Sequence, residues 1–148
     1  YLYGYSMIKP ETAFFEFVDT AISKKNIVMN NSDIPRRDNI YIRDAVDGLI
    51  TVAVKGVSGE AYNISTSNSL DSFAAADEIA KVICAVANEI NGTDISVEYS
   101  GEISETRRPG IMLNNTKLQE LGWQPKWSLK EGVRETISLY LDGTGRSI

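Results

Sequence analysis

The chain has 148 residues, of which 43% are apolar and 24% are charged, and this composition suits a globular domain with a core of its own. The net charge of −5 argues against a nucleic-acid-binding protein, which usually carries a basic face. No apolar run approaches the roughly 18 residues that a membrane span needs, and the first residues do not resemble a signal peptide, so we expect a cytoplasmic protein without a membrane partner.

Histidine is absent from the chain, and cysteine occurs once, at Cys84. The absence of histidine excludes Ser-His and Cys-His nucleophile systems and removes the commonest metal ligand, so we expect no metal site. Cys84 cannot form an internal disulfide, and it lies in an apolar stretch of helical pattern. We therefore expect a small buried thiol at this position.

The first third of the chain predicts a strand, a helix and a second strand. Residues 1–5 are aromatic and β-prone. Residues 10–24 carry an apolar stripe of helical period behind Pro10, a residue that suits a first helical position. Residues 27–29 predict a short strand, and the polar run 30–33 predicts a turn.

The stretch from Arg36 to Gly48 combines three arginines with a strand and a helix. A β-type run, Ile40-Tyr41-Ile42, is followed at once by an apolar pattern of helical period. The pattern runs through Val46, Leu49, Ile50 and Ala53. An arginine fork suits a carboxylate or a phosphate that is bound through two hydrogen bonds, although solvated surface arginines would give the same sequence.

The middle of the chain predicts a buried strand at Ala61–Ser65 and a long helix from Leu70 to about Ile90, which Asn91-Gly92 ends. We expect the core face of this helix at its apolar positions, Phe73, Ala76, Ile79, Ala80, Ile83, Ala87 and Ile90. Alternation over residues 95–99 predicts another strand. The polar loop that follows, residues 102–110, carries a second arginine pair, Arg107-Arg108.

The last part of the chain predicts two helices. The first is short, is stopped by Gly122 and is followed by Trp123, a large apolar anchor. Ser128 and Glu131 have the spacing of a capping box that opens the last helix. We expect its inward positions at Leu129, Val133, Ile137 and Tyr140 or Leu141, and a frayed tail over residues 143–148.

Five motifs occur in a fixed order. They are Tyr3-Gly4, Arg37-Asp38-Asn39-Ile40-Tyr41, Tyr62-Asn63-Ile64, the loop with Arg107-Arg108, and Leu121-Gly122-Trp123-Gln124-Pro125. Together they resemble the extended short-chain dehydrogenase/reductases that act on nucleotide-diphosphate sugars, the NAD-dependent epimerase/dehydratase family. Asn39, Ser65 and Asn115 stand where that family usually has an aromatic residue, a glycine and an aspartate.

This resemblance implies an α/β fold in which the chain is the C-terminal, substrate-binding portion of an NAD(P)-binding Rossmann-fold enzyme. Residues 1–142 would form the sugar-nucleotide-binding region, including late strands of the Rossmann sheet. The chain has no glycine-rich turn of the kind that takes the pyrophosphate of NAD or NADP in the family. A missing N-terminal Rossmann half would therefore carry the cofactor, and the full-length parent would be a homodimer.

The resemblance also implies site residues. Arg37 and one of Arg107 and Arg108 would contact the diphosphate of the nucleotide sugar, and the segment Val28, Met29 and Asn30 would lie near the nucleotide base. The parent would be an epimerase or dehydratase that oxidises the sugar ring transiently by hydride transfer, and this part alone would be inactive.

One further motif is disfavoured as a catalytic pair. Tyr5-Ser6-Met7-Ile8-Lys9 has the Tyr-x-x-x-Lys spacing of the short-chain dehydrogenases, in which the lysine lowers the pKa of the tyrosine. Pro10 follows Lys9 directly and biases it away from helical geometry, so the two side chains are not expected on one helix face. We expect no catalytic residue in this chain.

Two other hypotheses explain the same motifs. The chain could be a non-catalytic module of this fold that senses a sugar nucleotide or another anion, or a structural domain with surface arginines. If the chain is part of such an enzyme, we expect it to self-associate when isolated, because without the sheet of the missing half Tyr1–Tyr5 and Ala61–Ser65 would leave apolar surface or strand edges uncovered.

Overall fold

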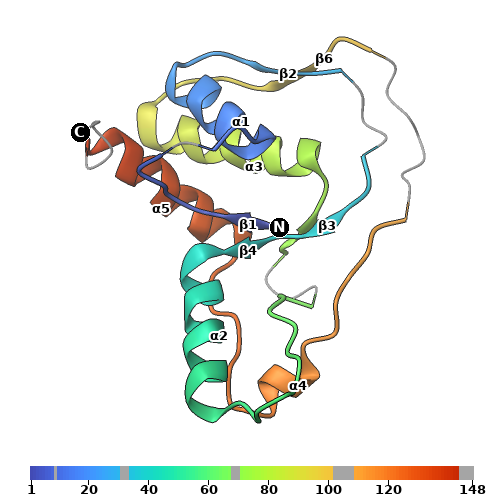
Figure 1. Cartoon of the computed structure of the whole chain (residues 1–148). Helices are drawn as coiled ribbons and strands as arrows, with labels where there is room; N and C mark the ends of the chain where they lie inside the picture. The colour runs from blue at the N-terminus through green and yellow to red at the C-terminus, as the bar shows by residue number, and fades with distance from the viewer. Residues whose placement is uncertain (9, 31–33, 68–70, 102–108, 144–148) are drawn as a thin grey trace.

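The computed structural model describes residues 1–8, 10–30, 34–67, 71–101 and 109–143. Three helices form the main layer of the fold: α1 (Ala13–Ile22), α3 (Ala76–Asn91) and α5 (Leu129–Leu141). α3 packs against both of the others, and Figure 1 shows the three helices grouped in the upper part of the molecule. Short strands lie along this layer, so the chain has a mixed α/β fold.

The core lies where the apolar stripes of these helices meet. α1 contributes the buried side chains of Phe17, Val18 and Ala21, which confirms the predicted stripe, although the helix begins at Ala13 rather than Pro10. The inward faces of α3 and α5 are buried as predicted at Ala80, Ile83, Ala87, Leu129, Val133 and Ile137. Cys84 is also part of this core, which confirms the buried thiol.

The strands form three pairs. β2 (Ile27–Met29) runs parallel to β6 (Val97–Tyr99), with Ile27 opposite Val97, and both were predicted. β1 (Leu2–Tyr3) runs parallel to β4 (Ile40–Tyr41), and β3 (Arg37–Asp38) runs antiparallel to β5 (Phe73–Ala74). Figure 1 shows β3 and β4 following one another between the upper helices and the lower part of the molecule.

The predicted strand that feeds a helix is confirmed, because α2 (Ile42–Lys55) begins directly after β4 and ends at Gly56. The apolar pattern of this helix is not buried, however. Its buried residues are Asp44, Ala45 and Gly48, whereas the side chains of Val46, Leu49, Ile50 and Val54 are exposed. Helical period therefore predicted the helix, but the face that packs is the one with the smaller side chains.

A second, smaller core joins α2 to the short helix α4 (Thr116–Gln119). Trp123 is buried there, as predicted for an apolar anchor, and its Nε1 donates to the backbone oxygen of Asp44 at 3.2 Å. The carboxylate of Asp44 accepts from the backbone nitrogens of Lys126 and Trp127, each at 3.0 Å. Asp44 therefore connects the arginine motif to the Leu-Gly-Trp-x-Pro motif.

One predicted strand is absent, and one predicted helix begins later than expected. Residues 61–65 form no strand, and the segment is held by single hydrogen bonds, such as that from Ser65 Oγ to Leu113 O at 2.9 Å. The long helix begins at Ala76 rather than Leu70, because Phe73 and Ala74 pair with β3 and the Glu78 carboxylate accepts from the Ala75 nitrogen at 2.8 Å. Leu70 and the tail residues 144–148 lie outside the described residues.

None of the helices in the described part of the chain is long and apolar enough to cross a membrane.

Candidate functional site

The strand β3 presents Arg37 at the surface and turns the next residue, Asp38, inward. Side chains alternate along a strand, so Arg37 is exposed while Asp38, the next residue, is buried. Arg37 lies opposite Ala74 of β5 and also forms a bridge with Ile111. Its backbone is therefore fixed on two sides, although its guanidinium reaches outward.

The three arginines of this region have different partners. The guanidinium of Arg36 donates to both carboxylate oxygens of Glu78, at 2.9 and 2.5 Å, and Arg43 forms an ion pair with Glu135 at 2.6 Å. Arg37 forms no ion pair with any described residue, and its guanidinium lies over the Tyr1 ring, 4.5 Å from the centroid. Arg37 is therefore the arginine whose hydrogen-bond donors remain available to an anion.

A cavity of about 300 Å³ opens beside Arg37. Its polar lining residues are Thr12, Arg37 and Asn39, and the other walls are apolar and come from β1, α1, the segment before β3, β5, α3 and α5. These walls include Tyr1, Leu2, Tyr3, Phe14, Phe17, Ile34, Pro35, Ile79 and Leu129. An apolar cavity with few polar groups and one unpaired arginine suits a ligand that has a flat apolar part and an anionic part.

The predicted base-binding segment lies next to this cavity. Val28, Met29 and Asn30 line a second hollow of about 300 Å³, which shares the side chains of Phe17 and Ile34 with the first. Met29 is a core residue, whereas Val28 is exposed. The sequence predicts Phe17 only as part of the apolar stripe of residues 10–24. Its position between the two hollows depends on tertiary packing, which no local sequence pattern shows.

Arg107 and Arg108 lie outside the described residues. The described residues on either side of that gap lie beside the site. Before it, Ser100 Oγ donates to Asn30 Oδ1 at 3.1 Å, and Gly101 lies so close to Asn30 that a Cβ there would come within 2.3 Å of its oxygen. After it, a Cβ on Gly110 would come within 2.2 Å of the Arg36 oxygen.

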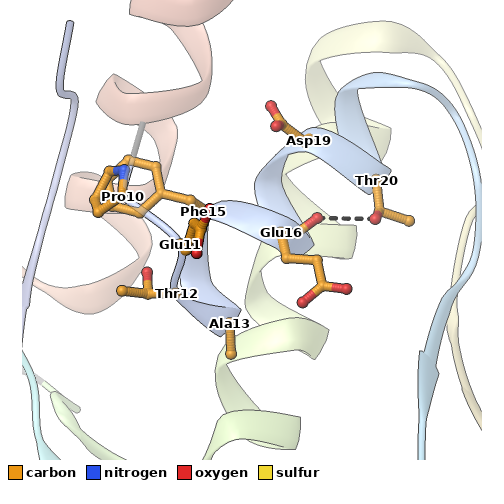
Figure 2. Close-up of a pocket in the computed structure, with 8 residues that line it drawn as sticks. All are labelled: Pro10, Glu11, Thr12, Ala13, Phe15, Glu16, Asp19 and Thr20. Atoms are coloured by element: carbon orange, nitrogen blue, oxygen red, sulfur yellow. Dashed lines mark hydrogen bonds between the residues drawn. The ribbon is translucent and has the colours of Figure 1, made fainter. Parts of the chain in front are cut away.

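A larger hollow of about 500 Å³ lies at the start of α1 (Figure 2). Glu11, Glu16 and Asp19 line it, and none of its eight lining residues is basic. The Thr20 hydroxyl donates to the backbone oxygen of Glu16 at 2.8 Å, as the dashed line in Figure 2 shows. Three carboxylates repel a phosphate, so this hollow is the poorer candidate for a nucleotide in spite of its size.

The described residues hold no apparent acid/base pair. The Tyr5 ring packs against Tyr140, with 4.9 Å between the centroids, and Lys9 lies outside the described residues, so the disfavoured Tyr5/Lys9 pair stays a sequence prediction. Burial raises the pKa of Tyr3 and of Tyr41, which keeps both phenols protonated near neutral pH. Among the described residues, no cluster of carboxylate or thiol side chains could hold a metal ion.

Comparison with known proteins gives a consistent result. Residues 1–65 match the NAD dependent epimerase/dehydratase family. The chain is 29% identical over 133 residues to the dTDP-D-glucose 4,6-dehydratase of Mus musculus, and 32% identical over 114 residues to the dTDP-glucose 4,6-dehydratase of Shigella flexneri. The chain is therefore similar over most of its length to NAD-dependent epimerases and dehydratases.

The chain spans less than half the length of the relatives it matches. The alignments cover 88% and 73% of the chain, but only 36% of the mouse protein and 30% of the Shigella protein. Among solved structures, UDP-glucose 4-epimerase of Thermotoga maritima with UDP-glucose superimposes with a TM-score of 0.71 at 23% identity, over 97% of this chain and 44% of that one. The dTDP-glucose 4,6-dehydratase of Bacillus anthracis in complex with NAD gives 0.70 at 24% identity, over 96% and 42%.

Proposed function

We propose that this chain is the C-terminal, substrate-binding portion of an NAD(P)-dependent epimerase or dehydratase of nucleotide-diphosphate sugars. Residues 1–142 form this portion in the proposal, and the remainder of the parent carries the cofactor and the catalytic residues. The match of residues 1–65 to the family supports an enzyme of this class, and the names of the relatives supply the substrate class.

The observation that carries the proposal is the free guanidinium of Arg37 at the mouth of an apolar cavity. A nucleoside diphosphate has a flat, partly apolar base and a doubly charged diphosphate, and the cavity offers a surface for each. Arg36 and Arg43 are already bound to carboxylates, so they contribute less to a phosphate. In this proposal Arg107 or Arg108 approaches the diphosphate from the other side, and Val28 to Asn30 lie near the base.

The residues present do not fit NAD or NADP. The pyrophosphate of such a cofactor needs a glycine-rich turn that leads into a helix N-terminus. The residues that precede α1, α2 and α3 are Thr12, Tyr41 and Ala75, and none of these described helices follows a glycine-rich turn. We therefore assign this portion to the substrate and derive no hydride-transfer step from it.

Calorimetric titration of the chain with UDP and dTDP tests the binding role. We expect saturable binding of at least one of them, and an affinity about 10 to 100 times lower for Arg37→Ala, because a charge-assisted pair to a phosphate contributes about 1.5–3 kcal/mol. Arg36→Ala is the matched control: it removes the same side chain one residue away, but one that is engaged by Glu78. Equal losses in the two variants would contradict the assignment of Arg37.

The full-length parent tests the enzyme class. We expect turnover of a UDP-, dTDP- or GDP-sugar by the parent with NAD or NADP, and loss of substrate affinity when Arg37 is replaced in it. Binding of the sugar nucleotide without turnover of any of them would support the sensing module instead.

A further inference from the structure

Asn39 lies in the wall of the Arg37 cavity and uses its side-chain nitrogen to hold two strands together. Nδ2 donates to the backbone oxygens of Arg37 at 2.8 Å, Ser72 at 2.9 Å and Ala74 at 3.2 Å. The side chain is almost wholly buried, with an exposed fraction of 6% for the residue. Three carbonyl oxygens on one side determine the orientation of the amide, since Oδ1 would be repelled from the same place.

This orientation leaves Oδ1 as an acceptor without a donor. No described residue donates a hydrogen bond to it, although the amide is held on its nitrogen side by three. Oδ1 is also not among the fully buried atoms that have no hydrogen-bond partner. Asp38 Oδ2, in contrast, is one of these atoms. Asn39 lines the cavity and its nitrogen side is fixed by the protein, so its oxygen is a fixed acceptor of the kind that orients a bound ligand.

We propose that Asn39 Oδ1 is a specificity-determining acceptor for a hydrogen-bond donor of the nucleoside part of the ligand. The inference rests on the proposed function, since it assumes a nucleotide in the Arg37 cavity. Two donors of a pyrimidine nucleotide have the required chemistry, the imide N–H of the base and the 2′-hydroxyl of the ribose.

Ligand analogues test this proposal on the unmodified chain. UDP is compared by calorimetry with 3-methyl-UDP, which lacks the imide N–H, and with 2′-deoxy-UDP, which lacks the hydroxyl. We expect one of the two analogues to bind about 10 times more weakly than UDP. The donor that this analogue lacks is the one that pairs with Oδ1, so Oδ1 stays unpaired inside its complex. The analogue that loses affinity identifies the donor.

Variants then show that the discrimination depends on Asn39. In Asn39→Ala the affinity ratio between UDP and the sensitive analogue should fall to about 1, even if the affinity for UDP itself also falls through loosening of β3 and β5. Thr12→Val is the matched control, since it removes another polar group of the same cavity, and it should keep the ratio of the unmodified chain. Circular dichroism checks that each variant keeps its fold.

Equal affinities of UDP and both analogues for the unmodified chain would overturn the assignment of Asn39 while leaving the proposed function intact. A ratio that persists in Asn39→Ala would overturn it as well, and would assign the discrimination to another residue. Two results would overturn the proposed nucleotide site at this cavity: no binding of either UDP or dTDP, or binding to Arg37→Ala as tight as to the unmodified chain. The Asn39 proposal would then be overturned as well.

Discussion

The carboxylate of Asp38 accepts two hydrogen bonds from Thr66, a residue 28 positions further along the chain. The backbone nitrogen of Thr66 lies 3.1 Å from Oδ1, and the Thr66 hydroxyl donates to the same oxygen. Both residues are buried. Because Asp38 belongs to β3, the strand that carries Arg37, this pair attaches the irregular segment 61–67 to the candidate site.

We therefore expect Asp38→Ala to destabilise the fold by about 1–3 kcal/mol, since it leaves the Thr66 nitrogen and hydroxyl buried without an acceptor. Urea unfolding followed by circular dichroism measures this loss. Asp94→Ala removes an exposed carboxylate and should change the free energy of unfolding by less than about 0.5 kcal/mol. Similar stabilities for the two variants would show that the Thr66 contact is not needed.

Asp44 should contribute more than any other carboxylate of α2. It is 1% exposed, and its carboxylate accepts from the backbone nitrogens of Lys126 and Trp127. Asp44→Ala should cost about 3 kcal/mol, because two part-buried N–H groups lose a buried, charged acceptor. The control on the same helix is Asp47→Ala, which removes only a surface ion pair to Lys126 and should cost about 0.5 kcal/mol in the same urea titration.

The sequence predicted best those elements whose pattern follows from local rules. The stripes of α1, α3 and α5, the capping box at Ser128 and the buried Trp123 were all correct, because each depends on residues within one or two turns. The segment at Ala61–Ser65 failed because β propensity shows that residues fit a pleated surface but not that a partner strand is present.

The candidate site was predictable only in part. The choice of Arg37 came from family resemblance and stays a prediction, and the structure adds that Glu78 and Glu135 form ion pairs with the other two arginines. The role of Asn39 was not predictable. The backbone oxygens that accept from Asn39, at Ser72 and Ala74, lie 33 and 35 residues away in the sequence. No pattern close to Asn39 therefore indicates that it holds β3 to β5.

Cys84 should be unreactive in the folded chain. It is 4% exposed, and burial raises the pKa of its thiol above the ordinary value. We expect slow reaction with Ellman's reagent at pH 8, and fast reaction once urea unfolds the chain, because the thiolate is the reactive form. Fast reaction without urea would contradict the burial of this residue.

The same raised pKa predicts the sign of a pH effect. The folded chain holds the thiol proton more tightly than the unfolded chain, so this contribution to stability is complete below the ordinary thiol pKa and is lost as the pH rises toward the folded value. The free energy of unfolding should therefore decline less steeply above about pH 8.5 in Cys84→Ala than in the unmodified chain. Parallel pH profiles would contradict this linkage.

The exposed face of α2 should drive self-association of the isolated chain. Leu49 is 60% exposed, Ile50 57% and Val54 76%, and these side chains follow one another along one helix that Figure 1 shows extending away from the three-helix layer. A contiguous apolar face of this kind is rarely left in water by a monomer. Because the face is a single stripe, a second copy can cover it by packing its own α2 against the first.

Sedimentation velocity over a range of concentrations measures this association. We expect the weight-average sedimentation coefficient to rise with concentration for the unmodified chain, and the rise to be suppressed in Leu49→Lys/Ile50→Lys, because the lysines place charges in the centre of the contact. Leu141→Lys is the control, since it replaces an exposed apolar side chain at the end of α5, away from the stripe, and should associate like the unmodified chain. If the α2 variant associates unchanged, the contact lies elsewhere, and the exposed side chains of Tyr1 and Leu2 become the next surface to substitute.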